Sequence, residues 1–217
     1  MNEHRHWTPV FDRIPEEKRN RILASAVAEF AKRGFSAAST AAIAEAAGIS
    51  IGSLFKYFRT KEDLYLAVVE LGLQTLDETL RPIVESGEPL LTKVERIVDA
   101  AFASRGVHDD LNRLYNRFTT EADADLANRL SRSLEGLTAE AYSRMIAEAQ
   151  DRGEIRRDLD PRVAAFLLDN ILLMLQFSMS NEYYRDRLAL YVGPRTVEDD
   201  DTLKRAIMTF LRSAFAE

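Results

Sequence analysis

The chain has 217 residues, a net charge of −6 and 46% hydrophobic residues, a composition typical of a folded globular protein with one large or two small domains. It contains no cysteine, which excludes disulfides, thiol catalysis and thiolate metal sites. The charge is uneven: residues 1–65 carry ten Lys and Arg against eight Asp and Glu, and the remainder carries 19 against 27. A mildly basic N-terminal part on an acidic body favours nucleic-acid contact at one end only.

The N-terminal residues 1–15 have no hydrophobic periodicity and contain two prolines, so we expect a flexible arm there. They lack the apolar core of a signal peptide, and we expect a cytoplasmic protein. The longest apolar stretch, residues 163–179, is interrupted by polar residues and is short for a membrane span. We therefore expect a buried helix in that stretch and no membrane partner.

The first predicted helix runs from Glu16 to Arg33, and Gly34 ends it. Apolar residues recur along it at helical spacing, namely Ile22, Leu23, Ala26, Val27 and Phe30. This stripe is expected to pack behind the next two helices and to hold them at a fixed angle.

Residues 39–61 predict two short helices, Thr40–Ala47 and Ile51–Tyr57, joined by a tight turn. Gly48 suits the end of the first helix because glycine adopts the left-handed conformation at little cost, and Ser50 suits the N-cap of the second. The expected buried side consists of Ile43, Ala47, Ile49 and Leu54. The residues left to face outward are Ile51, Gly52, Ser53, Phe55, Lys56 and Tyr57. This pattern is typical of a helix-turn-helix whose second helix lies in the DNA major groove.

The same pattern would also fit a helical hairpin inside an all-helical core. The residues that follow argue for DNA instead. Thr60 with an acid at Asp63 predicts the capped start of a third helix. Lys61 then lies in the first turn, where a cation opposes the helix dipole but where a phosphate would meet both the lysine and free N–H groups.

Many residues in this region, in a fixed order and without gaps, resemble the N-terminal domain of the TetR family of transcriptional regulators. They are Ile22, Leu23, Ala26, Phe30, Gly34, Phe35, Thr40, Ile43, Ala44, Ala47, Gly48, Ile49, Ser50, Gly52, Leu54, Phe55, Tyr57, Phe58, Lys61, Glu62 and Leu64. The resemblance implies an all-helical, two-fold dimeric, ligand-responsive repressor. It also implies a DNA-binding domain over residues 16–66 and an effector-binding and dimerisation domain over residues 67–217.

The resemblance assigns DNA contacts to nine positions: Ser39, Thr40, Ile51, Gly52, Ser53, Phe55, Lys56, Tyr57 and Lys61. Ser39 and Thr40 resemble contacts to the DNA backbone, and Lys61 resembles a phosphate contact. Position 51 is often basic or polar in the family. Here an isoleucine can meet a thymine methyl group but cannot donate a hydrogen bond to guanine.

Six further helices are predicted, and residues 182–198 are expected to form a loop. The helices span residues 60–80, 89–107, 109–118, 122–152, 161–181 and 198–215. The last two need more apolar cover than one subunit gives, which predicts a two-fold dimer built as a four-helix bundle.

An apolar effector pocket with a few polar groups is expected among these helices. Its candidate residues are Phe102, Tyr115, Phe118, Tyr142, Met145, Asn170, Met174 and Phe177. Each of them, taken singly, is also explained by ordinary core packing. Asp169 and Asn170, inside a very apolar helix, are either pocket groups, helix–helix partners or dimer contacts.

Together these patterns predict an all-α fold, with an N-terminal three-helix helix-turn-helix head and a C-terminal helical bundle that dimerises. The expected function is that of a homodimeric transcriptional repressor, released from a near-palindromic double-stranded DNA operator by an unidentified small apolar effector. The alternative is a helical ligand-binding or protein-interaction module with no DNA role. Three histidines, no cysteine and no Glu-x-x-His pair argue against an enzyme, and we expect no cofactor and no metal.

Overall fold

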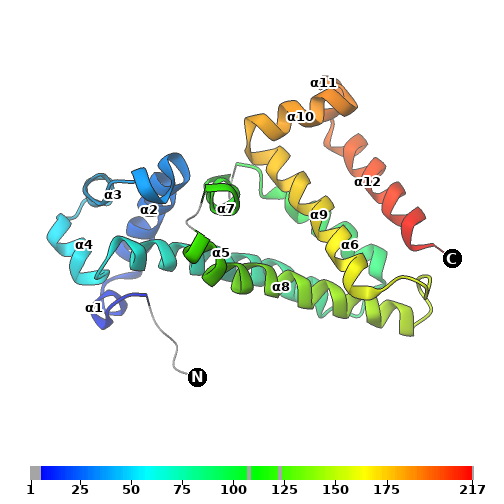
Figure 1. Ribbon diagram of the computed structural model, residues 1–217, viewed down its shortest axis with the longest axis horizontal. Coiled ribbons are helices and arrows are strands. Elements are labelled where there is room, and N and C mark those ends of the chain that lie inside the picture. The colour runs from blue at the N-terminus through cyan, green and yellow to red at the C-terminus, as the bar shows by residue number, and fades with distance from the viewer. Residues whose placement is uncertain (1–5, 107–108, 122–123, 217) are drawn as a thin grey trace. The chain divides into compact units, whose positions relative to one another are not determined.

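The computed structural model describes residues 6–106, 109–121 and 124–216, and the side chains of all of these except residues 118–134. The described residues form twelve α-helices and no strand, which confirms the all-α fold (Figure 1). The chain divides into two compact units, Met1–Thr75 with Arg113–Ala127, and Leu76–Asn112 with Asn128–Glu217.

The first unit contains the predicted helix-turn-helix and one helix that the sequence analysis missed. Its N-terminal elements are α1 (Pro9–Asp12), α2 (Glu16–Ala37), α3 (Thr40–Ala46), α4 (Ile51–Tyr57) and the first part of α5 (Lys61–Val84). α2 is broken at Gly34, which has a φ of 70°, so the predicted end of the first straight segment is confirmed. The core is formed by Ile43, Leu54 and Phe58 together with four residues of the predicted α2 stripe, Ile22, Ala26, Val27 and Phe30. The fifth, Leu23, is half-exposed.

The structure differs from the expected flexible arm in residues 6–15. The short helix α1 buries Phe11 to 3% exposure, and α1 contacts α4. Periodicity could not reveal this helix, because one turn that buries a single side chain produces no repeating pattern.

The second unit is a bundle around a core drawn from α5, α6, α8, α9 and α12. Its helices are the remainder of α5, α6 (Leu90–Ala103), the start of α7 (Asp109–Glu121), most of α8 (Ala124–Asp151), α9 (Pro161–Ser180), α10 (Glu182–Val192), α11 (Pro194–Val197) and α12 (Asp200–Phe215). α6 packs against both α9 and α12, so it is the central helix of this group.

The expected loop over residues 182–198 is instead helical. Asn181 caps α10 by accepting the Tyr183 N–H at 3.0 Å, and Gly193, at a φ of 82°, ends it. No residue of α10 is buried, so the helix leaves no apolar stripe in the sequence.

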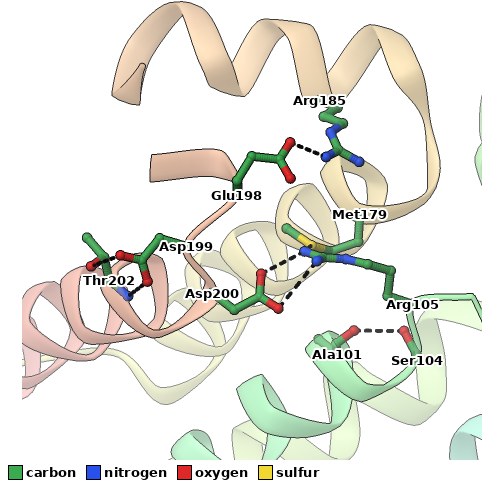
Figure 2. A network of polar contacts seen from close by, with 9 residues as sticks. All are labelled: Ala101, Ser104, Arg105, Met179, Arg185, Glu198, Asp199, Asp200 and Thr202. Atoms are coloured by element: carbon green, nitrogen blue, oxygen red, sulfur yellow. Dashed lines mark hydrogen bonds and ion pairs between the residues drawn. The ribbon is translucent and has the colours of Figure 1, made fainter. Parts of the chain in front are cut away.

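Buried and half-buried cations join the helices of the second unit. Lys93 is 1% exposed, and its Nζ donates to the Val84 carbonyl oxygen at 2.7 Å, which caps the end of α5. Arg105, just after α6, forms an ion pair with Asp200 at the start of α12, and its Nη2 lies 2.5 Å from Met179 Sδ of α9 (Figure 2). A second ion pair joins Arg185 to Glu198.

α9 is the one described helix that is long and apolar enough to cross a membrane, with a mean hydropathy of 1.6. Core helices of soluble proteins also reach this value, and half of the helix is buried. Leu168, Leu172 and Leu175 belong to the core cluster of the second unit. The expected burial is therefore observed on one side of α9, while Val163, Phe166 and Leu167 on the other side are exposed.

One carboxyl group lies half-buried within this apolar unit. Burial raises the pKa of Asp169 above its usual 3.8, while a hydrogen bond from Thr138 opposes the shift and the Glu135 charge adds to it. Tyr142 is 3% exposed, and burial together with the Asp169 charge raises its pKa as well. Asp169 of α9 therefore faces the side of α8 that carries Thr138 and Tyr142.

We predict that Asp169→Asn stabilises the protein near neutral pH but not in acid. Because the pKa of Asp169 is raised on folding, its contribution to stability is fully present below the unfolded pKa and is lost as pH rises through the folded pKa. Asparagine does not ionise, so the gain of the variant should appear above about pH 4 and grow toward neutrality. Urea unfolding across this range measures it, with Asp186→Asn on the exposed α10 as control. A gain that does not vary with pH would contradict the argument.

Candidate nucleic-acid interface

α3 begins at a well-formed N-cap. The Ser39 Oγ accepts the Ala42 N–H at 3.3 Å, and the Ser39 N–H donates to Glu29 Oε1 of α2 at 3.0 Å. Ser39 is exposed and Thr40 is half-exposed. The two predicted backbone-contact residues therefore lie together at the start of α3, which a hydrogen bond ties to α2.

The turn between α3 and α4 has the conformation that the sequence predicts. Gly48 has a φ of 65°, and the Ile49 N–H donates to the Ala44 carbonyl oxygen at 2.9 Å. The Arg21 Nε of α2 donates to the Ala47 carbonyl oxygen at 2.9 Å. One of the free carbonyl groups at the end of α3 is thus satisfied by a side chain from another helix.

α4 offers an exposed face that is largely apolar. Ser50 caps the helix by accepting the Ser53 N–H at 3.1 Å, and Leu54 is buried at 1% exposure. On the other side, Ile51 is 46% exposed and Phe55 is 42% exposed, with Gly52 and Lys56 also exposed. A side chain at Gly52 would meet only the Ser50 Oγ, at 3.9 Å from an ideal Cβ, so packing does not require glycine there.

The expectation that Tyr57 faces outward is wrong. Its side chain is 6% exposed, because Phe11 of α1 lies against it with ring centroids 5.7 Å apart. The Lys18 Nζ lies 5.6 Å from the same ring. Helical spacing placed Tyr57 on the open side, but the arm covers that position.

The predicted N-terminal cap at Thr60 is confirmed at the start of α5. The Thr60 Oγ1 accepts the Asp63 N–H at 2.9 Å and the Thr60 N–H donates to Asp63 Oδ2 at 3.1 Å, which is a reciprocal capping box. The Lys61 Nζ donates to the Ser36 carbonyl oxygen at 3.0 Å and lies 5.1 Å from the Phe35 ring centroid. An ammonium group has three donors, so this contact leaves Lys61 able to reach a phosphate.

Two residues near α4 were missed by the sequence analysis. Arg59 is exposed in the turn between α4 and α5, and its position beside the recognition helix was the available signal. Thr8 hydrogen-bonds the end of α4, donating through Oγ1 to the Lys56 carbonyl oxygen at 2.7 Å. No local pattern identifies a partner 48 residues away.

The predicted effector residues are only partly brought together. Tyr142 and Met145 are buried in the core of the second unit, and Phe102 packs against that core. Phe177, 3% exposed, has its ring centroid 5.4 Å from that of Tyr184. Asn170 donates to the Phe166 carbonyl oxygen of its own helix at 2.7 Å.

Two of the remaining three candidates, Met174 and Tyr115, are half-exposed. Met174 lies on α9, and Tyr115 lies in the part of α7 that belongs to the first unit. The Phe118 side chain lies outside the described residues. Within the second unit a cleft lies between α5 and α8, and none of the seven candidates with described side chains lines it; its described residues are Asp77, Leu80, Arg81, Val84, Glu85, Leu137, Glu140, Ala141 and Arg144.

Among the described residues, no group of three or more His, Cys, Asp or Glu side chains is arranged to hold a metal ion. The cleft between α5 and α8 is lined by both signs of charge, and the Arg81 side chain is paired with Asp77 one helical turn away.

Comparison with known proteins agrees with the geometry of the helix-turn-helix. Residues 22–68 match the family model described as bacterial regulatory proteins, tetR family. The transcriptional dual regulator CecR of Shigella flexneri is 36% identical over 78 residues, which cover 36% of this chain and 34% of CecR. The transcriptional repressor KstR2 of Rhodococcus jostii is 33% identical over 100 residues, covering 43% of this chain and 49% of KstR2. The chain thus spans half or less of the length of these curated relatives.

The fold of most of the chain is similar to that of a solved regulator. The structure of FadR from Bacillus subtilis in complex with stearoyl-CoA matches with a TM-score of 0.70 and 19% identity, over 88% of this chain and 96% of that one. At that identity the match shows a shared fold. With the family match at residues 22–68, the capped helix-turn-helix and the common helical architecture, the chain belongs to the TetR family of transcriptional regulators.

Proposed function

We propose that this protein is a homodimeric transcriptional repressor that binds operator DNA through α4 and is released by a small acyl effector. The observation that carries the DNA role is the exposed face of α4, where Ile51 and Phe55 remain about half in solvent although the helix is fixed on its other side. Large apolar side chains on a short, rigid and open helix are well explained by contact with base edges in the major groove.

The charges around α4 support this proposal. Lys56 and Arg59 are exposed beside the reading face, and Lys61 lies at the start of the next helix. These cations suit the phosphates that flank a groove, while Ile51 and Phe55 suit thymine methyl groups. Ser39 and Thr40, at the start of α3, are proposed as further backbone contacts, and Ser53 and Gly52 as close contacts at the start of α4. Tyr57 is withdrawn from the proposed contacts because the arm covers it.

A two-fold dimer is supported by the apolar surface that α9 and α12 leave open. Val163, Phe166 and Leu167 share one face of α9 and are 56%, 66% and 56% exposed, and Phe210 of α12 is 63% exposed. Faces of this kind are expected to pack against a second copy, as in a four-helix bundle. Dimerisation would give two α4 helices that reach successive major grooves about 34–36 Å apart.

The effector proposal rests on the second unit and on its structural relatives. That unit has an apolar core that contains Tyr142, and the half-buried carboxyl group of Asp169 lies beside this tyrosine. FadR of Bacillus subtilis binds stearoyl-CoA, which makes acyl-CoA thioesters the first class to test. Repression is supported by KstR2, which is a repressor.

The alternative is a helical ligand-binding or protein-interaction module with no DNA role. It gives no reason for the exposed Ile51 and Phe55 or for the cations beside them. It also predicts binding that depends little on salt, whereas the affinity of a DNA-binding protein falls steeply as salt rises.

We predict that Gly52→Ala weakens operator binding about 10-fold while leaving the protein as stable or more stable. In the free protein the added methyl group makes only an ordinary van der Waals contact with the Ser50 Oγ, at 3.9 Å, and alanine stabilises a helix by up to about 1 kcal/mol relative to glycine. In the complex the same methyl group would separate α4 from the groove, at a cost of about 1.4 kcal/mol. Operator fragments selected from genomic DNA, a titration at several salt concentrations and thermal unfolding measure both effects.

Gly136→Ala in α8 is the matched control for this test. An ideal Cβ there meets nothing within 4 Å, so the substitution should change stability in the same direction and leave DNA affinity unchanged. Equal operator affinity in Gly52→Ala and wild type would show that α4 does not approach DNA closely. A wild-type protein that selects no DNA fragment would favour the alternative function.

We predict that Phe166→Glu combined with Leu167→Glu converts the dimer into a folded monomer. Four charges would face one another across a two-fold contact, and desolvating them costs more than the interface can supply. Sedimentation should show half the wild-type mass, and operator affinity should fall by about 100-fold or more through the loss of avidity. Phe166→Leu keeps the surface apolar and should remain dimeric. A dimer that survives the double substitution would place the interface elsewhere.

We predict that a long-chain acyl-CoA raises the melting temperature and releases the operator. A ligand at 100 times its dissociation constant stabilises the folded state by about 2.7 kcal/mol. Thermodynamic linkage requires the ligand to lower the affinity for DNA by the same factor by which DNA lowers the affinity for the ligand. Stearoyl-CoA, a short-chain acyl-CoA, free fatty acid and free CoA distinguish recognition of the chain from recognition of the nucleotide. If no thioester shifts the melting temperature, this effector class is wrong while the DNA role stands.

A further inference from the structure

The C-terminal end of α4 is capped by a residue that lies far away in the sequence. The last carbonyl groups of a helix have no partners within it. Here the Phe58 N–H donates to the Leu54 carbonyl oxygen at 2.9 Å, and Thr8 satisfies two more groups. Its backbone N–H donates to the Tyr57 carbonyl oxygen at 2.8 Å, and its Oγ1 donates to the Lys56 carbonyl oxygen at 2.7 Å.

An aromatic cluster lies directly beside this cap. Phe11 is 3% exposed, with its ring centroid 4.7 Å from that of Phe58 and 5.7 Å from that of Tyr57. Phe58 is the residue that follows α4, and it is itself buried at 1% exposure. The arm thus contacts the last turn of α4 through two hydrogen bonds and through packed rings.

The arm is also tied to α2 and to itself. The Arg19 Nη1 of α2 donates to the Asp12 carbonyl oxygen at 2.9 Å. The Trp7 Nε1 donates to Asp12 Oδ1 at 2.8 Å, which joins the two ends of α1. α1 therefore bridges α2, which is part of the rigid core, and α4, which carries the proposed reading face.

We propose that Thr8 and Phe11 are positioning residues that fix the angle of α4 and so determine how well the protein distinguishes its operator from other DNA. This inference rests on the proposed DNA role of α4. A helix of seven residues is not stable alone, so its last turn depends on its partners. Sequence is distinguished by contacts from α4 to base edges, whereas contacts to phosphates carry no sequence information. Losing the cap should therefore reduce specific binding more than non-specific binding.

The test compares Thr8→Val with Thr8→Ser. Valine keeps the shape of threonine and removes the hydroxyl donor, while serine keeps the donor. In Thr8→Val, amide hydrogen exchange at Leu54–Phe58 in the free protein should accelerate about 3- to 10-fold, and operator affinity should fall by a similar factor. Affinity for unrelated DNA should change less than about twofold. Thr8→Ser should behave as wild type in all three measurements.

Phe11→Ala and Phe11→Leu provide a second pair, with Val10→Ala as control because Val10 is 47% exposed on the same helix. Phe11→Ala should accelerate amide exchange in α4 and lower the ratio of specific to non-specific affinity further than Thr8→Val does. Phe11→Leu should largely retain the wild-type exchange rate and affinity ratio. Unchanged exchange in Thr8→Val and Phe11→Ala would overturn the cap. Faster exchange with an unchanged affinity ratio would overturn the positioning role. Exchange is measured without DNA, so a wild type that binds no DNA would refute the proposed function and still leave the cap tested.

Discussion

The DNA-binding head depends on contacts that stabilise α4, because this helix is too short to be stable by itself. α4 has seven residues, and an isolated helix of that length does not persist in water because nucleation is unfavourable. Its geometry is therefore set by contacts at three places. Ser50 caps the start, Leu54 anchors the buried side, and Thr8 caps the end. The orientation of Ile51 and Phe55 is thus a property of the surrounding fold and not of the α4 sequence alone.

The low positive charge of the head has a consequence for the proposed function. Residues 1–65 carry ten Lys and Arg against eight Asp and Glu, so the excess of positive charge is small. Non-specific affinity for DNA grows with each phosphate that a protein neutralises. One head with so small a net positive charge is expected to bind weakly. Useful affinity then requires two heads that engage one operator together, which makes binding sensitive to the distance between them. A weakly charged head and an apolar dimer surface on α9 and α12 therefore fit the same function.

Sequence reasoning succeeded wherever the signal was local. Caps at Ser50 and Thr60, and the left-handed Gly48, were predictable because each interaction spans about four residues. It failed where the partner lies elsewhere in the chain. The ring that covers Tyr57 belongs to Phe11, which lies in a different part of the sequence. The helix α10 was missed for another reason, because it buries none of its residues and so leaves no apolar periodicity. The effector residues were the least predictable, because an apolar residue that lines a pocket and one that fills a core look alike in sequence.

The way α5 ends suggests how a ligand in the second unit could act on DNA binding. α5 begins at the capping box beside the reading helix and continues into the second unit as one helix. There, the buried Lys93 of α6 binds the Val84 carbonyl oxygen, and Glu154 accepts the Leu90 N–H at 2.8 Å, which fixes the start of α6. Breaking the contact between Lys93 and Val84 would leave a buried cation without its acceptor, which is costly. A ligand that moves α6 is therefore expected to move the end of α5 with it. It alters operator binding only by as much as it prefers one position of α6 over the other.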